Sequence, residues 1–433
     1  MINKKILIIT YYWPPSGGSG VQRWLKFAKY LPSLGWKTHI YTPSNPSFAI
    51  VDNSLLNDIP TEVEVIKQPI WEPYELFNQL NKLIGKKPVK PSDFISTGRE
   101  SVFKSLSTWV RGNLFIPDAR VFWVKSSIKF LDDYIKQNDI DKIITTGPPH
   151  SVHLIGLGLK KKNPALKWMA DFRDPWTEWD LLDTLMLSNA ARAKHKHLEH
   201  EVLTKADEVI TIAPYHVQRL EVLSKRKVTL LTNGFDDDDF KSVIHTRTSK
   251  FTIRHIGIVD ELRDPIPFME VVEVCCKNSP DFLQNISIEF IGNVNSAFKE
   301  YVKANGTLNS ITKFVSQMPH NELLKTYGQT DLQLLILAHT VIAPGNLPGK
   351  FFEYLASGNA ILALGPTNGD AAAVLHQTKA GEIFEREDSE GIQKALFNFY
   401  TQWKSNDFRN EINVSMYTRK NLTIELVKIL ESL

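Results

Sequence analysis

A lysine and a glutamate three residues apart, Lys350 and Glu353, are the side chains of this sequence best suited to hold a small anionic ligand. They stand in Pro344-Gly-Asn-Leu-Pro-Gly-Lys-Phe-Phe-Glu-Tyr-Leu-Ala-Ser-Gly358. Pro348 fits the first turn of a helix and Gly358 fits its end, so the segment predicts a short, well-bounded helix. Residues at this spacing share one helix face.

The chemistry of that face matches a nucleoside diphosphate. A helix N-terminus with a lysine in its first turn suits a diphosphate, and a carboxylate one turn further in can accept both hydroxyls of a ribose. From spacing alone, an ordinary ion pair on a solvated helix explains Lys350 and Glu353 equally well.

A glycine-rich loop, Tyr11–Gly20, is the second candidate. Gly17 and Gly18 let the backbone approach a ligand closely, and a helix starting near Val21 would point free N–H groups at an anion. The spacing matches neither the phosphate-binding loop of nucleotide hydrolases nor the dinucleotide fingerprint. A purely structural turn remains the alternative.

His150, Asp171 and Asp174 are the third candidate set, as catalytic residues. His150 follows an expected strand and opens an expected helix, where it could orient a hydroxyl group. The two aspartates flank Arg173 at the end of another strand, where carboxylates could activate a hydroxyl group as general bases. The alternatives are a satisfied polar histidine and a local Arg–Asp bridge that shapes the loop.

No metal site is expected. The run Asp236–Asp239 contains Asp-x-Asp, a pattern that can hold Mn²⁺ or Mg²⁺, but it lies in a turn-forming stretch away from the strand ends. The adjacent Cys275 and Cys276 can form neither a disulfide framework nor a four-ligand zinc site. Common zinc-hydrolase, serine-hydrolase and redox motifs do not occur.

The elements that must position these residues alternate between short apolar runs and longer amphipathic stretches. This alternation predicts parallel sheets covered by helices on both faces, and such sheets bind ligands beyond the carboxyl ends of their strands. The first series of expected strands is 5–10, 37–42, 63–68, 142–146, 167–171 and 208–212. The second series is 251–259, 287–292, 313–317, 332–338, 360–364 and 382–385.

The length of 433 residues fits two domains. We expect one α/β domain over residues 1–225, a linker over 226–250 and a second α/β domain over 251–411. The last segment, 412–433, is expected to pack back on the first domain. The net charge of +3 is too small to indicate a nucleic-acid partner.

The sequence predicts a cytoplasmic protein. The N-terminal apolar run Ile6–Thr10 is of strand length and lacks a cleavage site, and no run of roughly 18 apolar residues occurs. Four lysines at 82, 86, 87 and 90, mixed with apolar residues, would suit peripheral contact with the inner face of the cell membrane. A solvated loop is the alternative.

Leu347-Pro-Gly-Lys-Phe-Phe-Glu-Tyr-Leu-Ala-Ser-Gly-Asn-Ala-Ile-Leu-Ala-Leu-Gly365 resembles the donor-site motif of the retaining GT-B glycosyltransferases of family 4 (group 1). Asn233–Asp236 is similar to the family's inter-domain segment and Tyr11–Gly20 to its glycine-rich first loop. Ala170–Trp176 is similar to a segment found in one branch of the family. Together these matches span nearly the whole chain.

The resemblance implies an α/β fold of the GT-B type, with two Rossmann-like doubly wound parallel-sheet domains facing an interdomain cleft. Residues 1–225 would form the acceptor-side domain, with His150, Asp171 and Asp174 near the acceptor and the sugar, and residues 251–411 the donor domain. It implies metal-independent, retaining transfer of a hexose-type sugar from a nucleoside-diphosphate sugar to a glycan or lipid-linked acceptor, in surface polysaccharide biosynthesis. No cofactor is expected, because the nucleotide sugar is a substrate. Two alternatives stay open, a GT-B nucleotide-sugar epimerase and a non-catalytic binding subunit.

Matched position by position, the resemblance assigns donor binding to eight residues: Gly17, Gly18, Gly257, Arg263, Leu347, Pro348, Lys350 and Glu353. Two positions depart from the family pattern. Gly345 stands where the first glutamate of an E-x7-E pair is expected, and Ile258 replaces an arginine, so Arg263 with Lys350 is the expected diphosphate clamp. The identity of the sugar is therefore open.

Overall fold

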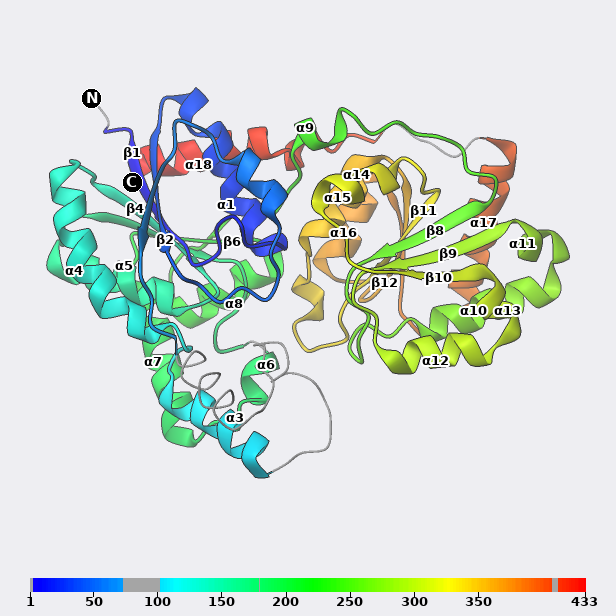
Figure 1. Ribbon diagram of the computed structural model, residues 1–433, viewed down its shortest axis with the longest axis horizontal. Coiled ribbons are helices and arrows are strands. Elements are labelled where there is room, and N and C mark those ends of the chain that lie inside the picture. The colour runs from blue at the N-terminus through cyan, green and yellow to red at the C-terminus, as the bar shows by residue number, and fades with distance from the viewer. Residues whose placement is uncertain (1–2, 73–101, 179, 407–411) are drawn as a thin grey trace. The chain divides into compact units, whose positions relative to one another are not determined.

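The computed structural model describes residues 3–72, 102–178, 180–406 and 412–433 (Figure 1). The chain forms two compact units. Unit 1 comprises residues 1–232 with 423–433, and unit 2 comprises residues 233–422. The division falls inside the range predicted as the linker. The lysine-rich stretch predicted to contact a membrane lies outside the described residues.

Unit 1 contains a seven-stranded sheet in the order β3-β2-β1-β4-β5-β6-β7, with every neighbouring pair parallel. Strand β4 is buried along its whole length, as expected for a parallel strand covered on both faces. The strand order reverses between β1 and β4, which makes their carboxyl ends the natural place for a ligand. The strands are β1 Lys5–Ile9, β2 Lys37–Pro43, β3 Glu64–Gln68, β4 Lys142–Gly147, β5 Lys167–Phe172, β6 Glu208–Thr211 and β7 Thr229–Leu230.

Helices cover the sheet of unit 1, and a hydrophobic cluster that includes Trp123, Trp168 and Trp176 fills the space beneath them. The helices are α1 Ser19–Tyr30, α3 Val102–Leu114, α4 Val121–Gln137, α5 Ser151–Lys162, α6 Asp180–Asp183, α7 Asn189–Lys205, α8 Pro214–Ser224 and α18 Arg419–Ser432, with the 3₁₀ turns η1 Pro32–Leu34 and η2 Asn53–Asp58. Helix α18 starts in unit 2 and continues into unit 1 from Thr423 onward.

Unit 2 repeats the same design with six parallel strands in the order β10-β9-β8-β11-β12-β13. Here the order reverses between β8 and β11. The strands are β8 Phe251–Ile256, β9 Ile286–Ile291, β10 Thr312–Val315, β11 Leu332–Ile336, β12 Ala360–Leu364 and β13 Gly381–Phe384.

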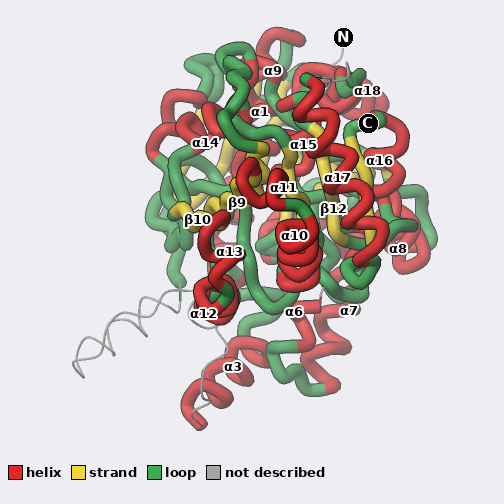
Figure 2. Tube along the Cα trace, turned by 90° about the vertical axis from the view of Figure 1, so that its right-hand side faces the viewer, coloured by secondary structure: helices red, strands yellow, loops and turns green. Residues whose placement is uncertain are grey.

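In unit 2, α10 and α17 pack against each other (Figure 2). Phe268 of α10, Phe282 of α11 and Phe399 of α17 belong to the hydrophobic core beneath these helices. The helices are α9 Asp237–Phe240, α10 Ile266–Asn278, α11 Pro280–Asn285, α12 Ser296–Ala304, α13 Gly306–Ile311, α14 His320–Tyr327, α15 Gly349–Ser357, α16 Asp370–Thr378 and α17 Ser389–Ser405, with the 3₁₀ turns η4 Ala343–Gly345 and η5 Ser415–Tyr417.

The predicted α/β architecture is confirmed. All twelve expected strands are present within one to three residues of their predicted ends, and β7 is one strand more than the sequence predicts. Within the described ranges, we find no helix with the length and apolar character needed to cross a bilayer.

Candidate functional site

Helix α15 presents the lysine and glutamate pair. Pro348 is its N-cap, one residue before the first turn in which the sequence analysis places it, and Gly358 ends the helix in the left-handed conformation at φ 68°. The helix packs on the core through an apolar face and leaves Lys350 and Glu353 partly exposed. Lys350, the second residue of the helix, therefore lies among the free N–H groups of the helix start, and Glu353 lies one turn further on.

Glu353 is held from both sides by residues of α14. The hydroxyl of Tyr327 donates to Oε2 over 2.7 Å, and Nε2 of His320 lies 3.4 Å from Oε1, an ion pair when the imidazole is protonated. Burial by itself raises the pKa of Glu353, but the hydrogen bond and charge of His320 outweigh it, with smaller contributions from Lys350 and Tyr327. The result is a pKa of about 2. The carboxylate is thus charged and fixed in orientation.

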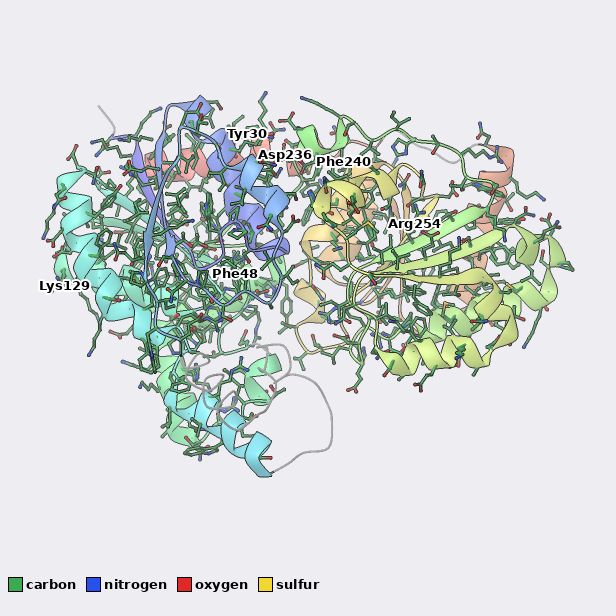
Figure 3. All side chains as sticks on the ribbon, viewed as in Figure 1. Tyr30, Phe48, Lys129, Asp236, Phe240 and Arg254 are labelled. Carbon is green, nitrogen blue, oxygen red and sulfur yellow. The ribbon has the colours of Figure 1, made fainter. Side chains whose placement is uncertain are left out.

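Tyr327 itself is fixed by its surroundings. Its ring packs 5.6 Å from that of Phe240, which α9 supplies (Figure 3). Arg254 on β8 donates to the carbonyl oxygen of Thr326 over 2.6 Å and pairs with Glu289 over 2.7 Å. The end of α14 is therefore fastened to the sheet, which keeps the tyrosine hydroxyl pointing at Glu353.

Lys350 has no hydrogen bond or ion pair with any residue in the described part of the chain. Burial lowers the pKa of its ammonium group, and the charge of Glu353 only partly opposes this. A partly buried cation without a partner is unfavourable, so an anion at this position would be stabilised.

The carboxyl end of β8 lies against the same helix. The hydroxyl of Tyr354 accepts from the backbone N–H of Ile256 over 2.8 Å. Gly257 follows directly, and a Cβ at this position would stand 3.1 Å from Nε2 of His255. The imidazole of His255 is buried with Nδ1 3.0 Å from the carbonyl oxygen of Leu334. Strands β8 and β11 and helix α15 therefore converge where the strand order reverses.

Arg263 lies in the loop after β8. Its Nη1 is 2.8 Å from Oδ2 of Asp260, and its backbone N–H donates to Oδ1 of the same residue over 2.9 Å. Burial chiefly lowers the pKa of His255 to about 4, and the charges of Lys350 and Arg263 add to this effect. Both cations are thus close enough to act on one imidazole, although Asp260 partly neutralises the arginine.

The structure brings the donor-side residues of unit 2 together. Leu347 is buried directly before Pro348, and Gly257, Arg263, Lys350 and Glu353 surround the carboxyl ends of β8 and β11. Ile258, where an arginine is expected from the resemblance, is 51% exposed. The roles of these residues in donor binding stay predictions.

In unit 1, the glycine-rich loop requires its glycines. A Cβ at Gly17 would stand 2.7 Å from a side-chain carbon of Ile50, and Gly18 has a φ of 90° as the N-cap of α1. A Cβ at Gly20 would stand 2.9 Å from Nη1 of Arg173. These contacts explain the glycines by packing, while the exposed Gly18 leaves the start of α1 open to a ligand.

Arg173 fastens this loop to its neighbour. Its guanidinium donates to the carbonyl oxygens of Gly20 over 2.8 Å, Gly147 over 3.1 Å and Pro148 over 2.6 Å. Burial lowers the pKa of Arg173, against the charges of two nearby aspartates. One buried cation therefore holds together the loops that follow β1, β4 and β5.

Asp171 is completely buried and its oxygens are saturated. Arg23 forms a two-pronged pair with it over 3.1 and 3.2 Å, and Trp24 Nε1 and the hydroxyl of Thr146 donate over 2.7 and 2.9 Å. Arg23 also donates to the carbonyl oxygens of residues 231 and 232. This geometry favours the alternative to catalysis, an Arg–Asp bridge that shapes the site, although the partner is Arg23 and not the neighbouring arginine.

Asp174 and His150 differ in exposure and in their contacts. Asp174 is partly exposed, forms no hydrogen bond with a described residue, and has a pKa that burial raises. His150 is only 6% exposed and its ring stacks on Trp176 at 5.0 Å. Burial lowers its pKa well below the usual value. Asp174 thus retains the capacity to accept a proton, while His150 is placed like a packing residue.

The aspartate run considered as a metal site serves as a helix start. Asp236 is the N-cap of α9, and its side chain accepts from the backbone N–H of Asp238. In the described part of the chain there is no cluster of three or more histidine, cysteine, aspartate or glutamate side chains arranged to hold a metal ion.

Sequence reasoning missed His320, Tyr327 and His255 as parts of the site. The first two belong to α14, which precedes α15 by some twenty residues, and no local pattern links them to Glu353. Only the packing of α14 beside β8 brings them to the carboxylate.

The chain is similar in structure to several known proteins. No family model matches the chain, and no curated protein matches it. Among solved structures, a glycosyltransferase from Rickettsia africae ESF-5 is 13% identical at a TM-score of 0.61, covering 99% of this chain and 98% of that one. WaaG, a glycosyltransferase involved in lipopolysaccharide biosynthesis, is 12% identical at 0.57, covering 98% and 99%. A putative UDP-N-acetylglucosamine 2-epimerase from Listeria monocytogenes is 10% identical at 0.58, covering 100% and 96%.

These similarities extend over the full length of the chain, but the identities are low enough that they establish the fold alone. Two parallel-sheet α/β units with strand orders that reverse in the middle, similar over their whole length to such structures, constitute a GT-B fold.

Proposed function

We propose that the protein is a glycosyltransferase that moves a sugar from a nucleoside-diphosphate sugar to a glycan or lipid-linked acceptor. The observation that carries this proposal is the arrangement on α15. There the partly buried Lys350, which has no hydrogen bond or ion pair with a described residue, precedes a carboxylate held by Tyr327 and His320. The lysine suits a diphosphate and Glu353 suits the two hydroxyls of a ribose.

The chemical step is the cleavage of the bond between the anomeric carbon and the diphosphate. Negative charge develops on the departing phosphate, and Lys350, Arg263 and the N–H groups of α15 are positioned to stabilise it. Because the protein supplies the positive charge that stabilises the departing phosphate, the proposed reaction requires no metal. The acceptor oxygen forms the new bond on the same face of the sugar, and its proton passes to a base. We propose Asp174 for this role, because among the three predicted catalytic residues it is the one that is partly exposed and forms no hydrogen bond with a described residue.

We further propose an acceptor and a cellular role. WaaG acts in lipopolysaccharide biosynthesis, and the resemblance of the α15 segment to the donor motif of family 4 agrees with a role in surface polysaccharide synthesis. We place the protein in the cytoplasm, with peripheral contact with the inner membrane face where its acceptor is lipid-linked.

A thermal-shift screen against UDP, GDP, ADP and CMP tests the proposal. A ligand at a hundred times its Kd stabilises the folded state by about 2.7 kcal/mol, which raises Tm by roughly 5 to 10 °C for a unit of this size. We expect one nucleotide to give this shift, and Lys350→Ala and Glu353→Gln to abolish it. The exposed Lys303→Ala and Glu300→Gln are matched controls in the same unit and should keep it. No shift with any nucleotide would exclude the proposal.

An epimerase is the second candidate, because a putative UDP-N-acetylglucosamine 2-epimerase resembles this chain about as closely as the glycosyltransferases do. An epimerase needs no acceptor. Incubation with the donor alone should therefore give an isomerised sugar if this candidate is right, and only slow hydrolysis if the protein transfers sugars.

A further inference from the structure

Beyond the carboxyl ends of β11, β12 and β13 lies a cavity of about 200 Å³ within unit 2. Its walls are residues 337–341, which follow β11, residues 365–366, which follow β12, and residues 385–387, which follow β13. Ala343 and Pro344 of η4 complete it. The cavity thus occupies the edge of the sheet at which parallel strands bind ligands.

The cavity is connected to the loop that carries Arg263. The carbonyl oxygen of Leu262 accepts from the backbone N–H of His339 over 2.9 Å and from the guanidinium of Arg386. Both donors line the cavity. A ligand group in the cavity would therefore lie next to the predicted diphosphate clamp.

The walls of the cavity are closely packed. A Cβ at Gly365 would stand 2.9 Å from the side chain of Leu337, and a Cβ at Gly369 would stand 2.9 Å from the carbonyl oxygen of Pro344. Gly345, the last residue of η4, adds no side chain next to the cavity wall. The void is thus bounded by close packing on its inner side.

The chemistry of the lining matches a sugar ring. Two carboxylates, Glu385 and Glu387, can accept hydrogen bonds from sugar hydroxyls, and Arg386 can donate hydrogen bonds to the hydroxyl oxygens. Val341 and Pro366 offer apolar surface to the C–H groups of the ring. With two acidic side chains against one guanidinium, the cavity does not favour a phosphate. A volume of about 200 Å³ is below the range of pockets that enclose whole drug-sized ligands and suits one part of a larger substrate.

The two carboxylates have different tasks. Oε1 of Glu385 accepts from the backbone N–H and the hydroxyl of Thr367 over 2.8 and 3.0 Å, which braces the loop after β12. Glu387 makes no side-chain hydrogen bond or ion pair with a residue in the described ranges. It is therefore the carboxylate free to meet a ligand.

We propose that this cavity binds a pyranose ring, with Glu387 accepting hydrogen bonds from its hydroxyls. The ring belongs to the donor or to the acceptor, and the assignment to either rests on the proposed function. The proposal adds to the clamp on α15 a second, sugar-selective subsite on the β13–α17 loop.

Saturation-transfer NMR with the methyl glycosides of glucose, galactose and mannose tests the subsite without any nucleotide. We expect transfer to at least one glycoside with the intact protein, its loss in Glu387→Gln and in the cavity-filling Thr340→Trp, and its retention in Glu390→Gln. Glu390 is exposed, lies three residues further on and does not line the cavity. No transfer in the intact protein, or equal transfer in Glu387→Gln and the intact protein, would overturn the proposal.

Titration with the nucleoside diphosphate found in the thermal-shift screen, and with its glucose, galactose and mannose conjugates, distinguishes the two sources of the ring. For a donor sugar, Glu387→Gln weakens the binding of one conjugate at least fivefold and leaves the free diphosphate unchanged. For an acceptor sugar, both affinities are unchanged while the glycoside signal is lost. If no nucleotide binds, the proposed function fails, whereas the glycoside experiment still decides the subsite.

Discussion

The two polar centres of the molecule differ in how their charges are satisfied. In unit 1, Asp171 accepts four hydrogen bonds and Arg173 donates three, all of them within the protein. In unit 2, Lys350 has no partner among the described residues, and Glu353 keeps acceptor capacity beside the groups that orient it. A saturated network builds a scaffold, while a partly satisfied one is ready for a ligand.

Charged motifs that look alike in the sequence therefore have different roles in the two units. Charged residues at strand ends occur in both units, and by type and spacing they look equally functional. What separates them is the number of unused donors and acceptors, which depends on contacts with distant segments.

Lowering the pH should have the largest effect on stability, and it should destabilise unit 1 first. Burial lowers the pKa of five histidines of unit 1: His39, His150, His153 (to about 3), His195 (to about 4) and His216 (to about 4). Their folded pKa values lie below the unfolded value of 6.5, so their contribution to stability is complete above 6.5 and is lost as pH falls toward 4. Each pKa unit corresponds to about 1.4 kcal/mol per group. Asp174 and Glu199, whose pKa burial raises, oppose this only in part.

Tryptophan fluorescence measures this directly, because nine of the ten tryptophans belong to unit 1 and only Trp403 to unit 2. We expect a fluorescence transition between pH 6 and 4. A signal that stays native down to pH 4 would contradict the account.

Asp171→Asn should cause the next largest effect, a decrease in the free energy of unfolding. It removes the charge that pairs with the buried Arg23, and breaking a buried pair by neutralising one partner destabilises by about 3–5 kcal/mol. Urea unfolding followed by tryptophan fluorescence should show this loss, while nucleotide affinity stays unchanged. Asp183→Asn, whose partner Arg192 is exposed, is the control and should change stability by less than about 1 kcal/mol. Full stability with lost activity would instead make Asp171 catalytic.

Lys350→Ala should lower kcat by roughly 10²- to 10³-fold, the usual effect of removing one group that stabilises developing charge. Because Lys350 has no partner in the described structure, its loss leaves no buried group unpaired, and stability should hold or rise slightly. Steady-state kinetics beside thermal unfolding of the unliganded variant separate the two effects. A large drop in Tm would show that the lysine is part of the scaffold after all.

Tyr327→Phe should have the smallest effect of the four, a modest loss of nucleotide affinity. It removes the hydroxyl that donates to Glu353 and keeps the ring contact with Phe240. One hydrogen bond contributes about 1 kcal/mol, so we expect roughly fivefold weaker nucleotide binding in calorimetry. The effect should vanish in a Glu353→Gln background, where there is no carboxylate to orient. Additive losses in the double variant would separate the tyrosine from the glutamate.

Much of the fold could be predicted from the sequence because its signal is local. Strands such as Lys5–Ile9 and Leu332–Ile336 are short, largely apolar runs, and such runs predict parallel strands that are covered by helices on both faces. The end of α15 at Gly358 follows from the left-handed conformation that glycine adopts easily. Strand β7, two residues long, lacks any such signal.

The site could be predicted only in part. Lys350 and Glu353 share one helix, so their common face follows from spacing. The partners of Glu353 come from α14, and the partner of Asp171 is Arg23, 148 positions away. Such long-range contacts have no period or motif, which is why Asp171 looked catalytic and His320 went unnoticed.

Hydrogen–deuterium exchange of the whole protein with and without the stabilising nucleotide tests the central claim most directly, since protection locates the bound diphosphate on the chain. We predict slower exchange in two segments, 257–263 after β8 and 347–353 at the start of α15, and loss of that protection in Lys350→Ala. Protection confined to other parts of the chain, with both segments unchanged, would contradict the assignment of the donor site.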